Sequence, residues 1–470
     1  MENYQPLFGV SLEDIQKIIA SALSTGGDYA DVFFEYSTSD ELTLRDGEVN
    51  SVESSADYGA GVRVVRNGRT GYAFSETTGM PELLRAARTA AGIASDPGAA
   101  VRQVQVHPVT FENRYRILRG WDEYPLTARR EFLQGLDGRF RAEIPCISKV
   151  ICNLAIDDSR IMFLNSEGDY FCDRRPCTTL SMVCILEKEG KSDNISTSRS
   201  FRMGSEMLGP DLADELIREV KEKSQYIFDA RQPKGGDMPV VMGSGSSGIL
   251  LHEAIGHAFE ADFNRKGISV FSDRMGKKIC SSKINVVDDA TIPSNRGSLN
   301  VDDEGVAGQK TYMVTRGVLT SYLHDRISAA YYGVAPTGNG RRESFRFNPI
   351  PRMRATYMED GEGTQEEIIR SVKKGIFVDN FTNGQVEIGA GDFTFYVKSG
   401  FLIEDGRLTA PIKDVNIIGN GPEALADIVE VAADSLVDDG AWTCGKDQYC
   451  AVSCGMPSVL VKSLTVGGSL

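Results

Sequence analysis

Two of the four histidines in this 470-residue chain, His252 and His257, lie five positions apart, and Glu253 directly follows the first. Neutral imidazole is a common metal ligand, and a carboxylate beside such a pair is typical of the general base of a metallohydrolase. The other two histidines, His107 and His324, are isolated. The segment from His252 to His257 is therefore the first candidate for a catalytic centre.

The spacing of this pair does not suit a regular α-helix. In His-Glu-x-x-His zinc proteases the imidazoles stand at i and i+4 and share one face of the helix. Side chains at i and i+5 are separated by roughly 140° around the axis, which is too far to share one ion. A π-bulge restores a common face, and Gly256 favours it. We therefore predict a non-α turn across Glu253–His257, against the alternative of two unrelated histidines on a core helix.

A catalytic zinc takes three protein ligands and keeps a fourth position open. Two histidines leave one ligand to find, and Glu260 in particular is equally compatible with a solvated or capping carboxylate. Spacing alone does not choose among the chemically capable side chains, which are Glu260, Asp262, His324, Cys280, Cys444, Cys450 and Cys454.

Composition and charge exclude several classes of function. A net charge of −15 without a Lys/Arg-rich stripe argues against nucleic acid as a ligand. No apolar run approaches the ~18–20 residues of a membrane span, and the N-terminus lacks the basic and apolar regions of a secretory signal. Nine dispersed cysteines, an odd number, favour a reduced protein. We expect a cytoplasmic protein with no membrane segment.

The pattern of short apolar runs predicts an α+β protein of two domains. The first, 1–232, is an α/β domain of helices and short strands, and the second, 233–470, is β-rich and carries the helix of the candidate metal site. Capping residues predict two helices, one over 11–23 with a Ser11–Asp14 capping box and one after Thr364. The first short strands are expected at 29–36, 41–45, 49–54 and 61–66.

Several segments in the same order resemble the TldD/PmbA family, also known as modulators of DNA gyrase, in its metal-bearing TldD-type branch. The resemblance covers nearly the whole chain. It is carried by Leu251–Phe263, Gly338–Ser344, Gly384–Val386, Gly391–Phe393, Ile418–Gly421, Cys444–Asp447 and Leu464–Gly468.

The resemblance implies a zinc metalloprotease that cuts unfolded or unstructured peptides. It implies zinc held by His252, His257 and Cys444, with Glu253 as the general base on the zinc-activated water. It also implies a dimer, formed either with a second copy or with a PmbA/TldE-type chain that lacks the metal motif. The chain departs from the family pattern after Asp447, where Cys450 and Cys454 are best interpreted as small buried hydrophobes.

Two further segments are candidates for contact with a peptide. The glycine-rich segment with Arg341 and Arg342 is interpreted as a flexible loop over the cleft that binds substrate, or equally as a solvated turn in a subunit interface. The strand 385–388 is a candidate edge for β-augmentation by an extended peptide, and an interior strand is the alternative. The competing class of function is a non-catalytic regulatory or peptide-binding subunit.

Overall fold

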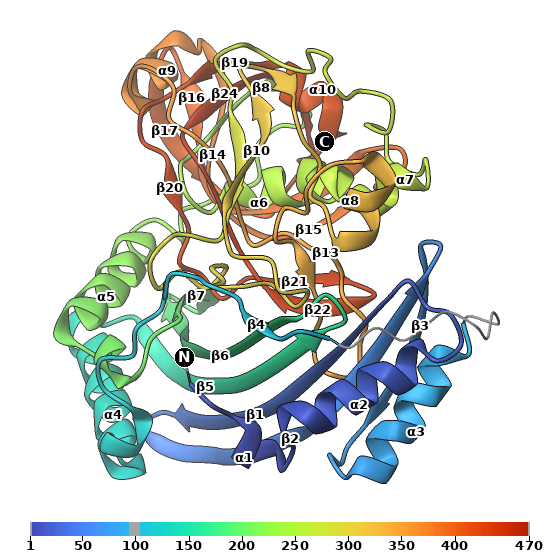
Figure 1. Ribbon diagram of the computed structural model, residues 1–470. Coiled ribbons are helices and arrows are strands. Elements are labelled where there is room, and N and C mark those ends of the chain that lie inside the picture. Colours follow the sequence, from blue (N-terminus) through green and yellow to red (C-terminus); the bar gives the residue numbers. More distant parts are fainter. Residues whose placement is uncertain (1, 94–103, 469–470) are drawn as a thin grey trace.

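One long curved sheet dominates the first half of the computed structural model, which describes residues 2–93 and 104–468 (Figure 1). The strand order is β3-β2-β1-β5-β6-β4, and β7 pairs with β6. The strands are β1 (Tyr29–Arg45), β2 (Glu48–Arg66), β3 (Arg69–Ser75), β4 (His107–Pro108), β5 (Ile147–Asn165), β6 (Asp169–Lys188) and β7 (Lys191–Phe201).

The prediction of short strands in this half is wrong. The runs 29–36 and 41–45 are one strand, β1, and the runs 49–54 and 61–66 lie within β2. The polar middle of β1 continues the strand because β2 and β5 pair with it on both edges and satisfy its backbone. Its side chains bond across strands as well, since Ser37 Oγ lies 2.8 Å from Ser159 Oγ. Backbone pairing therefore carries the strand through a segment with no apolar pattern.

Helices cover one face of this sheet at both of its ends (Figure 1). The helices α2 (Leu12–Leu23) and α3 (Met80–Ala91) pack on one end, and α4 (Leu126–Glu143) and α5 (Pro210–Ser224) pack on the other. The predicted capping box at the start of α2 is confirmed, because the side chains and backbone of Ser11 and Asp14 bond reciprocally. Since side chains alternate along a strand, Val32 and Phe34 face the helices while Asp31 and Phe33 face the second half of the chain.

The second half is built from two larger sheets and two small hairpins, with few helices between them. In one sheet, strands run in the order β15-β8-β24-β18-β16-β17, and β15 also pairs with β16, which closes five of the strands into a ring. Its members are β8 (Gly236–Met242), β15 (Lys374–Val386), β16 (Asp392–Glu404), β17 (Arg407–Ile412), β18 (Val415–Asn420) and β24 (Val459–Val466), with β19 (Ile428–Val431) on β24.

The other large sheet has the order β11-β10-β9-β14-β23-β20. Its strands are β9 (Val286–Asp289), β10 (Lys310–Thr315), β11 (Val318–Leu319), β14 (Ala355–Met358), β20 (Leu436–Val437) and β23 (Ser453–Met456). The hairpins are β12 (Gly340–Arg341) with β13 (Ile350–Pro351), and β21 (Thr443–Lys446) with β22 (Gln448–Ala451). The helices are α6 (Gly248–Leu251), α7 (Ala261–Arg265), α8 (Arg326–Tyr332), α9 (Gln365–Ser371) and α10 (Gly421–Ala426).

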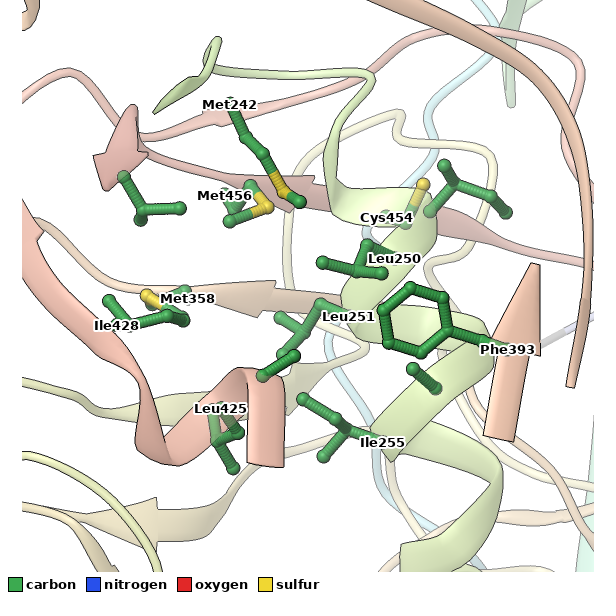
Figure 2. Packing of buried hydrophobic residues seen from close by; sticks show 14 of the residues in the cluster. Met242, Leu250, Leu251, Ile255, Met358, Phe393, Leu425, Ile428, Cys454 and Met456 are labelled. Carbon is green, nitrogen blue, oxygen red and sulfur yellow. The ribbon is translucent and has the colours of Figure 1, made fainter. Parts of the chain in front are cut away.

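The segment that begins with α6 lies in the shared core of these two sheets. Figure 2 shows Leu250, Leu251 and Ile255 among Met242 of β8 and Met358 of β14, all of them buried. An apolar helix held from both sides is a rigid support, so the polar side chains that it carries are fixed in position.

Among the described residues, no helix is both long and apolar enough to cross a membrane.

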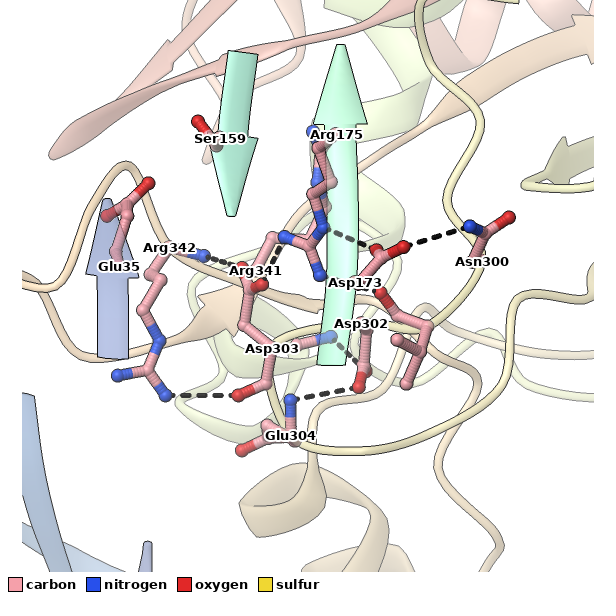
Figure 3. A network of polar contacts seen from close by, with 12 residues as sticks. Glu35, Ser159, Asp173, Arg175, Asn300, Asp302, Asp303, Glu304, Arg341 and Arg342 are labelled. Carbon is pink, nitrogen blue, oxygen red and sulfur yellow. Dashed lines mark hydrogen bonds and ion pairs between the residues drawn. The ribbon is translucent and has the colours of Figure 1, made fainter. Parts of the chain in front are cut away.

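The two halves meet through buried charges. Arg63 of β2 donates from Nε to Asp31 Oδ2 at 2.7 Å and from Nη1 to Glu304 Oε1 at 2.6 Å, and all three side chains are fully buried. Figure 3 shows the same surface further along, where Asp303 lies between Arg175 and Arg342. Buried ions are tolerated only when they are paired, so each half supplies counter-charges that the other half needs.

We predict that Arg63→Met lowers the free energy of unfolding by about 3–5 kcal/mol, because Glu304 stays buried without the Arg63 cation and Asp31 keeps only the more distant Arg342. The matched control is Arg66→Met on the same strand. Arg66 pairs with Asp28 at the surface, where the two side chains are 33% and 47% exposed, and such a pair contributes about 0–1 kcal/mol. Denaturant unfolding followed by circular dichroism measures both. Equal losses for the two variants would contradict this account.

Candidate metal centre

The chain after α6 forms a π-helical turn, η3, over His252–Gly256, followed by a 3₁₀ turn over His257–Phe259. The backbone N–H of His257 donates to the carbonyl of His252, which is the i→i+5 bond of a π-helix. The predicted non-α turn is therefore confirmed. It brings both imidazoles to one side of the segment, with ring centroids 5.2 Å apart.

Two glycines allow the π turn to pack closely. Gly256 has ordinary helical angles, φ −59° and ψ −47°, so it does not serve by backbone flexibility. A Cβ on Gly256 would lie 2.3 Å from Met353 Sδ, and a Cβ on Gly421 of α10 would lie 2.2 Å from the carbonyl oxygen of Ala254. Each glycine therefore removes a side chain where a neighbour must touch the turn.

The hairpin β21–β22 brings a thiol to the two imidazoles. One ligand atom each from His252, His257 and Cys444 lie within 4.8 Å of one another, and all three residues are buried. Cys444 Sγ is 3.3 Å from His257 Nε2. The hairpin is held by the fully buried Arg352, which donates to the carbonyls of Cys444 at 2.6 Å and Gln448 at 2.8 Å.

A carboxylate behind His257 fixes the orientation of its ring. His257 Nδ1 donates to Glu260 Oε2 at 2.9 Å, which leaves Nε2 facing Cys444. Glu260 in turn lies 3.1 Å from Lys446 Nζ, and Lys446 donates to Asp262 Oδ1 at 2.7 Å. Burial alone would raise the pKa of Glu260, but the charges of Lys446 and His257 lower it to about 2. The carboxylate therefore stays ionised, as an outer partner of a metal-binding histidine must be.

The charges in the site favour a thiolate at Cys444. Burial raises the pKa of a thiol, yet the neighbouring imidazoles of His252 and His257 lower that of Cys444 to about 4. Burial likewise acts to lower the pKa of His257, but Glu260 and Cys444 raise it well above its ordinary value. A thiolate is the form of cysteine that binds metal ions.

His252 provides the test of whether this site fits a metal. Among the described residues, neither of its buried ring nitrogens has a hydrogen-bond partner, and a buried imidazole in that state carries an energetic cost unless something binds it. Two imidazoles and a thiolate form a donor set that suits zinc, whose ligands in a tetrahedral site stand about 3.3–3.6 Å apart. The donor set and the unpartnered imidazole both fit a zinc ion with one open position.

Glu253 is the accessible member of the cluster. Its Oε2 lies 3.9 Å from His257 Nε2, and its side chain is 25% exposed, whereas the side chain of His257 is 4% exposed. A carboxylate that lies near the imidazole and also meets solvent is placed to exchange protons with water beside the candidate ligand atoms.

The other ligand candidates lie elsewhere or have other partners. Among the residues that the structure describes, His252, His257 and Cys444 form the one group suited to a metal. Glu260 and Asp262 bind Lys446. His324 packs between Tyr322 and Tyr332, where burial lowers its pKa to about 4. Of the three remaining candidates, Cys450 on β22 and Cys454 on β23 are buried, as predicted, and Cys280 is buried as well.

The prediction of a flexible loop at Arg341 and Arg342 is wrong, because each side chain is buried and bound to protein. Arg341 Nη2 donates to the carbonyl of Ala451 at 2.8 Å, and Arg342 Nη2 donates to the carbonyl of Asp303 at 3.0 Å. Arg341 thus ties β12 to β22, whereas Arg342 also reaches Tyr72 and Asp31 of the first half. Neither is free to contact a peptide in this structure.

Sequence reasoning missed the roles of Glu260 and Lys446. The sequence offers Glu260 only as one of several possible ligands, and Lys446 only as part of the segment Cys444–Asp447. The signal for Lys446 was its place two residues after Cys444, because alternate residues of a strand share a face. Its partner Asp262 is 184 positions away, so no local pattern links them.

Family models match three parts of the chain. The PmbA/TldA metallopeptidase domain 1 matches residues 30–94, the central domain matches 119–225, and the C-terminal domain matches 235–468. A protein of Haemophilus influenzae named metalloprotease TldD homolog is 35% identical over 449 residues, which cover 94% of this chain and 93% of that protein. This chain belongs to the PmbA/TldD metallopeptidase family.

Two further proteins are similar to this chain, one in sequence and one in fold. A zinc metalloprotease TldD homolog of Saccharolobus solfataricus is 30% identical over 293 residues, which cover 62% of this chain and 65% of that protein. The crystal structure of TldE from Thermococcus kodakarensis has the same fold, with a TM-score of 0.75 at 18% identity, over 97% of this chain and 100% of that chain. The predicted family is therefore confirmed, and its members named as proteases support a protease here.

We predict that Glu260→Gln weakens metal binding about 10–100-fold, because the ring of His257 loses its charged acceptor. Competition with a chromogenic chelator measures the affinity of the purified protein. Asp262→Asn is the matched control, since Asp262 also binds Lys446 but does not touch His257. An unchanged affinity in Glu260→Gln, or an equal loss in both variants, would contradict the orienting role.

Proposed function

We propose that this chain is a zinc metallopeptidase whose metal is held by His252, His257 and Cys444. The observation that carries the proposal is the convergence of these three buried donors on one side of a π turn, with the accessible Glu253 beside them. The alternative, a non-catalytic subunit, gives no reason to keep a buried imidazole without a partner. Family members named metalloproteases favour the enzyme.

Glu253 is proposed as the general base. When bound, zinc supplies a Lewis acid that polarises the scissile carbonyl and lowers the pKa of water toward ~7. The carboxylate of Glu253 takes a proton from the attacking water and then delivers it to the nitrogen of the leaving amine. Glu260 holds His257 in one ring orientation throughout, and the buried walls of the site keep other water away.

The edge of β15 suits an unfolded peptide as substrate. β15 pairs with β8 only at Ile376–Val378, and from there to Val386 the structure records pairing with β16 alone for the described residues. The strand β15 packs against η3, and Gln385 near its end is exposed. An extended peptide can add to such an edge through backbone hydrogen bonds. These bonds need an unfolded chain, and they depend little on the sequence of the peptide.

The partner is proposed to be a second copy or a PmbA/TldE-type chain, because TldE shares this fold from end to end. A reducing location such as the cytoplasm agrees with the cysteines, all nine of which lie in described parts of the chain and are free.

We predict that Glu253→Gln keeps zinc but loses about 10²–10⁴-fold in kcat on an unstructured peptide, because the proton acceptor is gone. His257→Ala is the matched comparison and loses both metal and activity. Metal analysis of the purified proteins and a fluorogenic peptide assay give the two readouts. Full activity in Glu253→Gln would remove the general-base role, and a wild-type protein that neither binds zinc nor cleaves peptides would favour the non-catalytic alternative.

We predict that one backbone N-methyl group near the scissile bond of a good peptide substrate lowers kcat/KM at least about 10-fold, because it removes a hydrogen bond to the edge of β15. The same peptide methylated far from the scissile bond is the control. Steady-state cleavage rates measure both. Equal rates at every methylated position would contradict β-augmentation.

A further inference from the structure

Cys450 faces Cys444 across the hairpin β21–β22. The register pairs Cys444 directly with Cys450, between the pairs Thr443–Ala451 and Gly445–Tyr449. Alternate residues of a strand share a face, and both cysteines lie on the buried face whereas Gly445 and Tyr449 are exposed. The two cysteines therefore lie side by side on the buried face of the hairpin.

The distance between these two positions suits a disulfide. Residues directly opposite in an antiparallel pair have Cα atoms about 4.5–5.5 Å apart, and disulfides form over about 4.4–6.8 Å. Both strands are already held by Arg352, which contacts the carbonyl of Cys444 at 2.6 Å and Cys450 Sγ at 3.5 Å. A bond between the sulfurs therefore needs no rearrangement of the hairpin.

This pairing is specific to the hairpin. In no other strand pairing within residues 2–93 and 104–468 do two cysteines stand opposite each other. The other cysteine near the site, Cys454, lies on β23 opposite Thr356 of β14. The register alone thus selects Cys450 as the neighbour of Cys444.

We propose that a hydroperoxide oxidises this pair to a Cys444–Cys450 disulfide, which withdraws Cys444 from the metal site. The loss of zinc in this inference rests on the proposed function, whereas the disulfide itself depends only on the hairpin. One thiol reacts with hydrogen peroxide to give a sulfenic acid and water. The other thiol then attacks that sulfur, forms the S–S bond and releases a second water, so two electrons pass from the two thiols to the peroxide.

Burial of the pair sets the class of oxidant and the outcome. Cys444 and Cys450 are 2% and 6% exposed, which favours a small hydroperoxide over a bulky disulfide as the oxidant. With Cys444 in a disulfide, two imidazoles remain, and zinc affinity falls by more than the roughly 10–100-fold that loss of an outer partner costs. A thiol reductant restores the site, whereas an unpaired Cys444 proceeds to irreversible sulfinic acid.

The experiment treats zinc-loaded, full-length protein with hydrogen peroxide and follows two readouts other than activity. Zinc release is measured with a chromogenic chelator, and the cysteines are mapped by mass spectrometry after alkylation and denaturation. Lys446 lies between the two cysteines, so trypsin separates them unless the disulfide joins the fragments. We expect the joined fragments to appear as zinc is released, and reductant with added zinc to reverse both changes.

Two variants make the assignment specific. Cys450→Ala should hold zinc as the wild type does before oxidation, and peroxide should then give no joined fragments and no recovery with reductant. Cys454→Ala is the matched control and should behave as the wild type, which also excludes Cys454 as the partner within the same tryptic fragment.

Several outcomes would overturn the proposal. Wild-type protein whose Cys444 becomes sulfinic acid without a disulfide would do so, as would full reversibility in Cys450→Ala. A preparation that binds no zinc but still forms the Cys444–Cys450 disulfide would instead contradict the proposed zinc site and leave the pairing intact.

Discussion

The candidate metal centre depends on one backbone constraint, the five-residue turn between His252 and His257. Imidazoles at i and i+5 face apart on an α-helix, so the site exists only where the chain adopts i→i+5 bonding. Such a turn is uncommon, and it is stable only where the neighbouring residues pack against it. Here Met353 packs against Gly256 and α10 packs against Ala254, so the core on both sides determines the geometry of the site.

Local patterns in the sequence predicted local structure well. The capping box at Ser11 and the helix cap at Thr364 were confirmed, because the partners of both residues lie within three positions. The π turn was confirmed because two scarce histidines imposed a spacing that an α-helix does not satisfy. The family was recognised from motifs spread over the chain, and the choice of Cys444 came from that resemblance, since spacing left seven candidates open.

Features that depend on distant partners escaped prediction. The polar segment in the middle of β1 suggested a break, but pairing with β2 and β5 carries the strand through it. Arg341 and Arg342 suggested an exposed loop because glycines surround them. Their partners include Ala451 and Asp303, which no pattern near residue 341 reveals. Whether a charged side chain can be buried depends on whether a hydrogen-bonding or oppositely charged partner is buried with it. For these arginines the partners lie far away in the sequence.

The separation of Cys444 from His257 along the chain has a consequence for biosynthesis. The two residues are 187 positions apart, and β24, which belongs to the same ring of strands as β15, ends at Val466. A nascent chain carries both histidines long before it carries the thiol, and the ring of strands closes only after β24 has been made. The candidate ligand set is therefore incomplete until Cys444 has been synthesised, so the nascent chain up to that point lacks a complete candidate metal centre.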